Sequence, residues 1–130
     1  MKLVWFRRDL RAVDNTALNA AIESGEPVLA LFVATPHQWQ QHHMSPKQAD
    51  LIVRRLHDLK HELDALNIPL LYKEVHNFTE SAECVATLAK QLSANEVLVN
   101  QEYEINEQQR DILTYSKLSE HGIKSEAKRS

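Results

Sequence analysis

The sequence predicts a Rossmann-like α/β fold, a doubly wound parallel sheet with the strand order 3-2-1-4-5 in a three-layer α/β/α arrangement. Short apolar runs alternate with amphipathic helical patterns along the chain, which is typical of parallel sheets. The run from Pro27 to Ala34 is apolar on both faces, as a central strand covered by helices should be. With 130 residues and no internal repeat or linker, residues 1–130 are expected to form one domain.

The first β-α-β unit opens the chain. A strand is predicted at Lys2–Phe6, followed by a helix over Asn15–Ser24 with apolar residues at helical spacing. Asp14 or Asn15 can cap the start of this helix, and Gly25 can adopt the left-handed conformation that ends it. The apolar run described above is then the second strand.

The longest helix is predicted to begin at a capping box, Ser45-Pro46-Lys47-Gln48, with proline at the first helical position. Its apolar stripe comprises Ala49, Ile52, Val53, Leu56, Leu59, Leu63 and Leu66. The helix should end near Asn67, before Pro69.

The second half repeats the alternation. We expect a strand at Leu70–Val75, a helix opening at Asn77 or Thr79 with the stripe Ala82, Val85, Leu88, Ala89 and Leu92, a strand at Val97–Asn100, a helix from about Asn106 to Gly122, and a fifth strand beginning at Ile123.

Composition is that of an ordinary globular domain, with 43% apolar and 25% charged residues. A net charge of −3 provides no broad positive field for nucleic acid or an anionic membrane. The longest apolar stretch is too short to span a bilayer, and the residues after Lys2 have no signal-peptide pattern. The single cysteine, Cys84, excludes an intrachain disulfide, so we expect a cytoplasmic protein.

Polar residues gather where the strands end. The cluster RRDLR at 7–11 follows the first strand, EYEINE at 102–107 follows the fourth, and the irregular connection 35–44 follows the second with His37, Trp39, His42 and His43. Ligands of open α/β sheets bind at the carboxyl ends of the strands, at the switch point, here between strands one and four. The three clusters should therefore converge there, although no phosphate-binding glycine loop is present.

Structural roles compete with these interpretations. The charges between Arg7 and Asp14 can form a salt-bridged strand end or an interdomain contact. Asn106 and Glu107 also suit the first turn of a helix, as an N-cap and a favourable acid. His57 and His61 have the spacing of a metal pair but lie off the apolar stripe, so a solvated helix face is expected and no metal site is assigned.

The stretch WFRRDLRAVDNTAL resembles the N-terminal signature of the DNA photolyase/cryptochrome family, with Arg7, Asp9, Leu10, Arg11, Asp14 and Asn15 in place. The segments ATPHQWQQHHMSPKQ and YEINEQQRD are similar to class I cyclobutane-pyrimidine-dimer photolyases that use a folate antenna. The resemblance covers nearly the whole chain. Family members continue into a larger helical domain, so it identifies residues 1–130 as the N-terminal α/β domain, a fragment.

The resemblance implies a function for this domain. It would bind the antenna pigment methenyltetrahydrofolate, with pterin contacts at His42, Asn106 and Glu107. FAD and the flipped-out pyrimidine dimer would lie in the absent C-terminal domain, so no catalytic residue is expected in this chain. Its partners would be that FAD-binding domain and, through the full-length deoxyribodipyrimidine photo-lyase, UV-damaged DNA. The fragment alone would be inactive.

Two alternatives remain open at this stage. A cryptochrome-type blue-light photoreceptor has the same domain without repair, and other members bind deazaflavin or flavin antennas. A stand-alone small nucleotide-binding α/β protein is the alternative from another class, and the missing phosphate loop counts against it.

Overall fold

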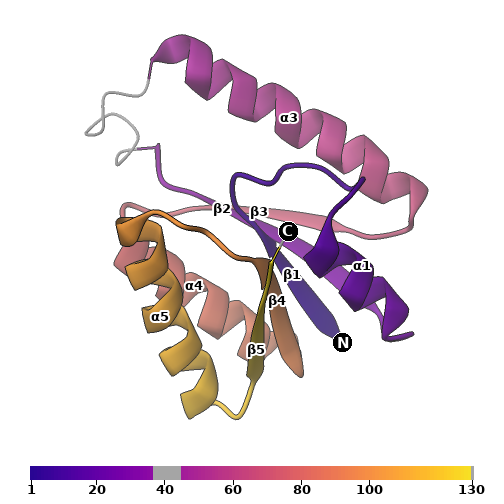
Figure 1. Ribbon diagram of the computed structural model, residues 1–130, viewed down its shortest axis with the longest axis vertical. Coiled ribbons are helices and arrows are strands. Elements are labelled where there is room, and N and C mark those ends of the chain that lie inside the picture. Colours follow the sequence, from indigo (N-terminus) through magenta and orange to yellow (C-terminus); the bar gives the residue numbers. More distant parts are fainter. Residues whose placement is uncertain (37–44, 130) are drawn as a thin grey trace.

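The computed structural model describes residues 1–36 and 45–129, and it confirms the predicted parallel sheet (Figure 1). The strands are β1 (Lys2–Phe6), β2 (Val28–Ala34), β3 (Leu70–Glu74), β4 (Glu96–Asn100) and β5 (Lys124–Lys128). They are arranged in the predicted order β3-β2-β1-β4-β5. β1 pairs with β2 on one side and with β4 on the other, so the switch point lies between β1 and β4.

In the part of the chain that the structure describes, four helices cover the two faces of the sheet and form three layers with it (Figure 1). They are α1 (Thr16–Glu23), α3 (Pro46–Ala65), α4 (Phe78–Gln91) and α5 (Ile105–Glu120). Side chains of β1 alternate between two cores, because Val4 and Phe6 pack with α1 and α3 whereas Leu3 and Trp5 pack with α4 and α5. Both faces of β1 are thus buried.

The apolar stripe predicted on α3 is confirmed in part. Leu59 and Leu63 are fully buried, and Ile52 and Leu56 pack partly buried against the same core. Val53 and Leu66 are each 49% exposed, and Leu66 is the C-cap residue, beyond the last helical residue. The N-terminal half of α3 extends past the sheet, so residues there have less to pack against (Figure 1). Neither α3 nor any other helix in the described part of the chain is long and apolar enough to cross a membrane.

The N-terminal caps predicted for α1, α3 and α4 are confirmed. The Asn15 side chain accepts a hydrogen bond from the Leu18 N–H, and Asn77 does the same for Glu80. Ser45 and Gln48 form the predicted reciprocal capping box on α3. These side chains satisfy N–H groups that the first turn of each helix leaves without a partner.

Residues in the left-handed conformation end the helices. Gly25 and Gly122 have φ values of 75° and 70°, as predicted for helix ends, but Asn67 and Ser93 occupy the same region with φ of 59° and 56°. After α4, the Ser93 N–H donates to the Lys90 carbonyl and the next N–H donates to Ala89, which is a Schellman closure. A side chain at this position is strained because of its Cβ atom.

Ser93→Gly is therefore expected to stabilise the domain by about 0.5–1 kcal/mol, since relief of strain exceeds the added flexibility of the unfolded chain. Ser93 is exposed and its change removes no core contact. The measurement is the midpoint of chemical denaturation. Gly122→Ser is the matched reciprocal control, because a Cβ there meets no atom within 4 Å and only the conformational cost remains. A lowered midpoint for Ser93→Gly contradicts the prediction.

Candidate functional site

A cavity of about 680 Å³ opens at the carboxyl ends of β1, β2 and β4. It is lined by Arg7, Arg8, Asp9, Leu10 and Arg11 after β1, by Phe32, Val33 and Thr35 of β2 and its end, by Gln48, Leu51, Ile52 and Arg55 of α3, by Phe78 and Ser81 of α4, and by Glu102, Glu104, Asn106, Glu107 and Arg110. Two of the three polar clusters therefore converge as predicted. Residues 37–44 of the third lie outside the described residues.

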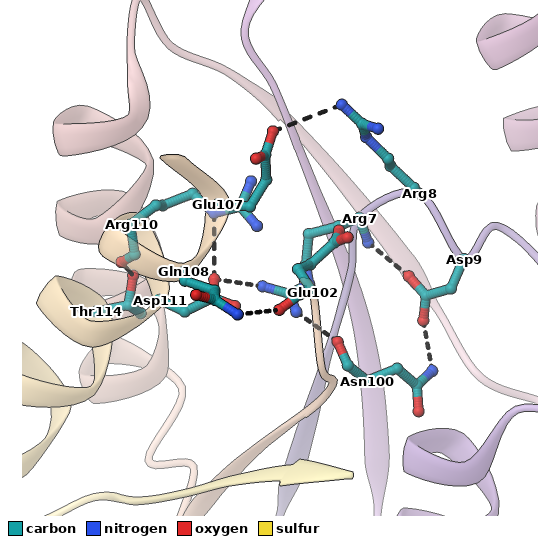
Figure 2. Close-up of polar contacts among 10 residues, drawn as sticks. All are labelled: Arg7, Arg8, Asp9, Asn100, Glu102, Glu107, Gln108, Arg110, Asp111 and Thr114. Carbon is teal, nitrogen blue, oxygen red and sulfur yellow. Dashed lines mark hydrogen bonds and ion pairs between the residues drawn. The ribbon is translucent and has the colours of Figure 1, made fainter. Parts of the chain in front are cut away.

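Arg7, the first charged residue after β1, has a structural role. Its side chain is buried, and its guanidinium donates to the Asn100 carbonyl and to Asp111 Oδ1, both at 2.5 Å (Figure 2). The same guanidinium lies 4.8 Å from the centre of the Trp5 ring. Arg7 thus joins β1, β4 and α5 from one position.

A second structural contact is made by the buried side-chain amide of Asn100, at the end of β4. Asn100 Nδ2 donates to Asp9 Oδ2 at 2.5 Å and to Asn15 Oδ1 at 2.8 Å, while its Oδ1 accepts from the Ala17 N–H at 2.9 Å. The spacing of Asp9 and Asn15 therefore has a structural purpose, because it ties the loop after β1 and the start of α1 to β4. Asn100 was not singled out from the sequence, although an asparagine ending an otherwise apolar strand is a usable signal.

A second buried arginine stands on α5. The Arg110 guanidinium lies between two rings, 5.0 Å from Trp5 and 4.9 Å from Phe78, and its Nε donates to Asp111 at 3.2 Å. Burial, together with the neighbouring Arg7 charge, lowers the pKa of Arg110. Sequence analysis missed Arg110 and Asp111. Helical spacing could have identified both residues as buried, because they lie on the same face of α5 as its other buried residues. These buried positions are Glu107, Arg110, Asp111, Thr114 and Leu118.

Glu102 adds a carboxyl group to the same cavity. Burial raises its pKa, and the positive charges of Arg7, Arg110 and Arg8 oppose that rise. Its carbonyl oxygen accepts from Gln108 Nε2 at 3.4 Å, which holds the segment after β4 against α5 (Figure 2). The cavity wall is therefore mixed in charge, with acids set among several guanidinium groups.

Of the three predicted pterin contacts, the structure describes two. Glu107 is 8% exposed and Asn106 is exposed, and both line the cavity from the first turn of α5. His42 lies outside the described residues. Among the residues described, the hydrogen-bonding side-chain partner of Glu107 is Arg8, at 3.5 Å (Figure 2).

The prediction of Asn106 as an N-cap is wrong. α5 begins one residue earlier, at Ile105, and its N-cap is Glu104. The Glu104 side chain makes no capping hydrogen bond and instead pairs with Arg8 at 2.9 Å. Glu107 does lie in the first turn, where an acid is favoured by the helix dipole, so that part of the structural interpretation is confirmed.

The remaining candidates lie away from the cavity. His57 and His61 are exposed on α3, and Cys84 is half-buried on α4, where burial raises the pKa of its thiol. Within residues 1–36 and 45–129, no group of three or more His, Cys, Asp or Glu side chains is arranged to hold a metal ion.

Comparison with known proteins points to one family. A family model described as DNA photolyase matches residues 2–130. The chain is 59% identical over 123 residues to a deoxyribodipyrimidine photo-lyase of Vibrio cholerae, a match that covers 95% of this chain and 26% of that protein. It is 48% identical over 111 residues to the Escherichia coli K12 protein of the same name, covering 85% of this chain and 24% of that protein.

Solved structures confirm the fold. The crystal structure of a cryptochrome from Synechocystis superposes with a TM-score of 0.88 at 23% identity, covering 98% of this chain and 26% of that one. At this identity the likeness concerns the fold alone. The chain spans about a quarter of the length of the curated relatives it matches.

Proposed function

The chain belongs to the DNA photolyase family, and from this premise we propose that it is the antenna-binding domain of a deoxyribodipyrimidine photo-lyase. Such an enzyme uses light to split cyclobutane pyrimidine dimers in DNA. Two relatives of that name are 59% and 48% identical to this chain, which favours repair over a photoreceptor role. The whole activity would require the remaining three-quarters of the protein, which would hold FAD and the lesion.

The observation that carries the antenna assignment is the position of Glu107. Its carboxylate is 8% exposed, lines the cavity at the switch point, and has one long side-chain contact among the described residues. A pterin presents an amino group and a ring N–H side by side, and a carboxylate can accept both. The donor and acceptor chemistry of the site therefore fits methenyltetrahydrofolate.

The chain's own residues would bind and orient this ligand. Glu107 would accept the paired N–H groups, Asn106 would pair with the neighbouring acceptor, and His42 would pack on the ring or donate to it. When bound, the pigment would absorb near-ultraviolet or blue light and pass the excitation energy to reduced FAD. Further contacts would come from the C-terminal FAD-binding domain, so the isolated domain would hold folate poorly.

Rigid support for the ligand would come from the buried network beneath it. Arg110 and Asp111 fix α5 to the sheet through Trp5 and Arg7. The first turn of the same helix carries Asn106 and Glu107. A carboxylate held on a rigid helix start retains its direction when the ligand arrives, which lowers the cost of binding.

A division of labour within the full-length protein tests the proposal. The full-length protein should repair dimers under light, whereas residues 1–130 should bind duplex DNA weakly and repair none. The chain has 15 basic and 18 acidic side chains, and enzymes that act on bases flip them into a dedicated pocket, here assigned to the other domain. Fluorescence anisotropy at physiological salt, with undamaged and UV-irradiated duplexes, measures the binding. Tight, lesion-specific binding by this chain alone would overturn the assignment.

A further inference from the structure

We propose that Arg8 is an internal competitor of the antenna for the Glu107 carboxylate, and that Glu104 retains Arg8 when the ligand binds. The inference rests on the proposed function and adds a control of affinity to the same site. It is carried by the placement of one arginine between two acids of the α5 start.

The Arg8 guanidinium bridges the two acids. Its Nη1 lies 2.9 Å from Glu104 Oε1, and its Nη2 lies 3.5 Å from Glu107 Oε1. The Arg8 and Glu104 side chains are 66% and 63% exposed, but the Glu107 side chain is only 10% exposed. An exposed guanidinium therefore contacts a buried carboxylate (Figure 2).

Arg8 and a pterin offer Glu107 the same chemistry. A guanidinium presents two N–H groups in a planar fork, which matches the two oxygens of a carboxylate. The amino group and ring N–H of a pterin form a similar fork. In the structure Arg8 gives Glu107 a single N–H, from Nη2 to Oε1, because its Nη1 pairs with Glu104. A pterin fork that engages both carboxylate oxygens competes with Arg8 for Oε1, so occupation by the ligand loosens that contact.

The geometry makes this exchange easy. At 3.5 Å, the contact with Glu107 is long for a charge-assisted hydrogen bond, whereas the contact with Glu104 has the usual length. Glu104 is free for this role because its side chain does not cap α5. Arg8 can thus leave Glu107 without losing its charge partner.

The test is a titration of the full-length protein with 5,10-methenyltetrahydrofolate, read by the absorption and fluorescence of the pigment. Arg8→Gln should tighten binding by about two- to fivefold, the range expected when an exposed ion pair is removed. Glu104→Gln should weaken binding, because Arg8 then has Glu107 as its remaining acid. In the double variant Arg8→Gln/Glu104→Gln, the weakening should disappear.

Arg54→Gln is the matched control, because Arg54 is exposed on α3 and does not line the cavity. Unchanged or weaker binding by Arg8→Gln would overturn the inference, as would a Glu104→Gln effect that persists without Arg8. Failure of the proposed function looks different. In that case neither the wild-type protein nor any of these variants binds the pigment.

Discussion

Glu107→Ala should lower the affinity of the full-length protein for methenyltetrahydrofolate by about ten- to a hundredfold. The estimate follows from the loss of a buried, charge-assisted hydrogen-bonding group, which costs about 1.5–3 kcal/mol. The pigment absorption band of the purified protein, divided by its flavin band, measures occupancy. FAD content, dark binding of damaged DNA, and repair under light that excites the flavin directly should stay near wild type.

Two further variants make the result specific. Glu107→Gln keeps the shape of the side chain but has a single acceptor oxygen, so its affinity should lie between those of the wild type and Glu107→Ala. Glu120→Ala removes an exposed acid from the other end of α5 and should leave pigment binding unchanged. If Glu107→Ala retained the full pigment band, Glu107 would have only its role at the helix start.

The sheet was predictable because its signals are local. Apolar runs, caps and glycines act within a few residues, so the strand order, the cap at Asn15 and the helix ends at Gly25 and Gly122 all agree with the structure. Convergence of the clusters after β1 and β4 then followed from a rule about parallel sheets. This rule of topology brought the segments 7–11 and 102–107 together at the carboxyl edge of the sheet, although they are far apart in the sequence.

The buried charges were not predictable in the same way. Arg7, Asn100 and Asp111 meet only after β1, β4 and α5 have assembled, and each alone has the pattern of an exposed residue. A charged side chain is buried only where partners surround it, and partners that are distant in the sequence cannot be identified from a local pattern. For the charges at 7–11, the sequence left ligand or partner contacts and a salt-bridged strand end both open. Arg7 and Asp9 serve the fold, as the second alternative expects, and they line the cavity together with Arg8.

Smaller errors have similar causes. Val53 and Leu66 belong to the predicted apolar stripe of α3, but both are about half exposed, and Leu66 lies at the C-cap, beyond the last helical residue. Asn106 has good capping chemistry, yet the N-cap of α5 is Glu104, two residues earlier, and the Glu104 side chain pairs with Arg8. At the start of α5 a tertiary contact outweighed a local preference, whereas Val53 and Leu66 lack the tertiary contacts that the local pattern led us to expect.

Asp111→Ala is expected to destabilise this domain by about 3–5 kcal/mol, because it leaves two buried guanidinium groups without their shared carboxylate. Asp111 Oδ1 accepts from Arg7 at 2.5 Å and from Arg110 at 3.2 Å, and all three side chains are less than a tenth exposed. Domains of this size are stable by only about 5–15 kcal/mol, so the loss is a large share of the total. Chemical denaturation followed by circular dichroism measures it.

The matched control for this prediction is Asp64→Ala, which breaks the exposed pair between Lys60 and Asp64 at 3.0 Å. Exposed pairs contribute about 0–1 kcal/mol, so this variant should unfold close to wild type. Adding Arg110→Met to Asp111→Ala should restore part of the stability, because an apolar side chain between Trp5 and Phe78 no longer needs a counter-charge. If Asp111→Ala alone lost less than about 1 kcal/mol, water would be solvating the two arginines, and the network would not be the support on which α5 and Glu107 depend.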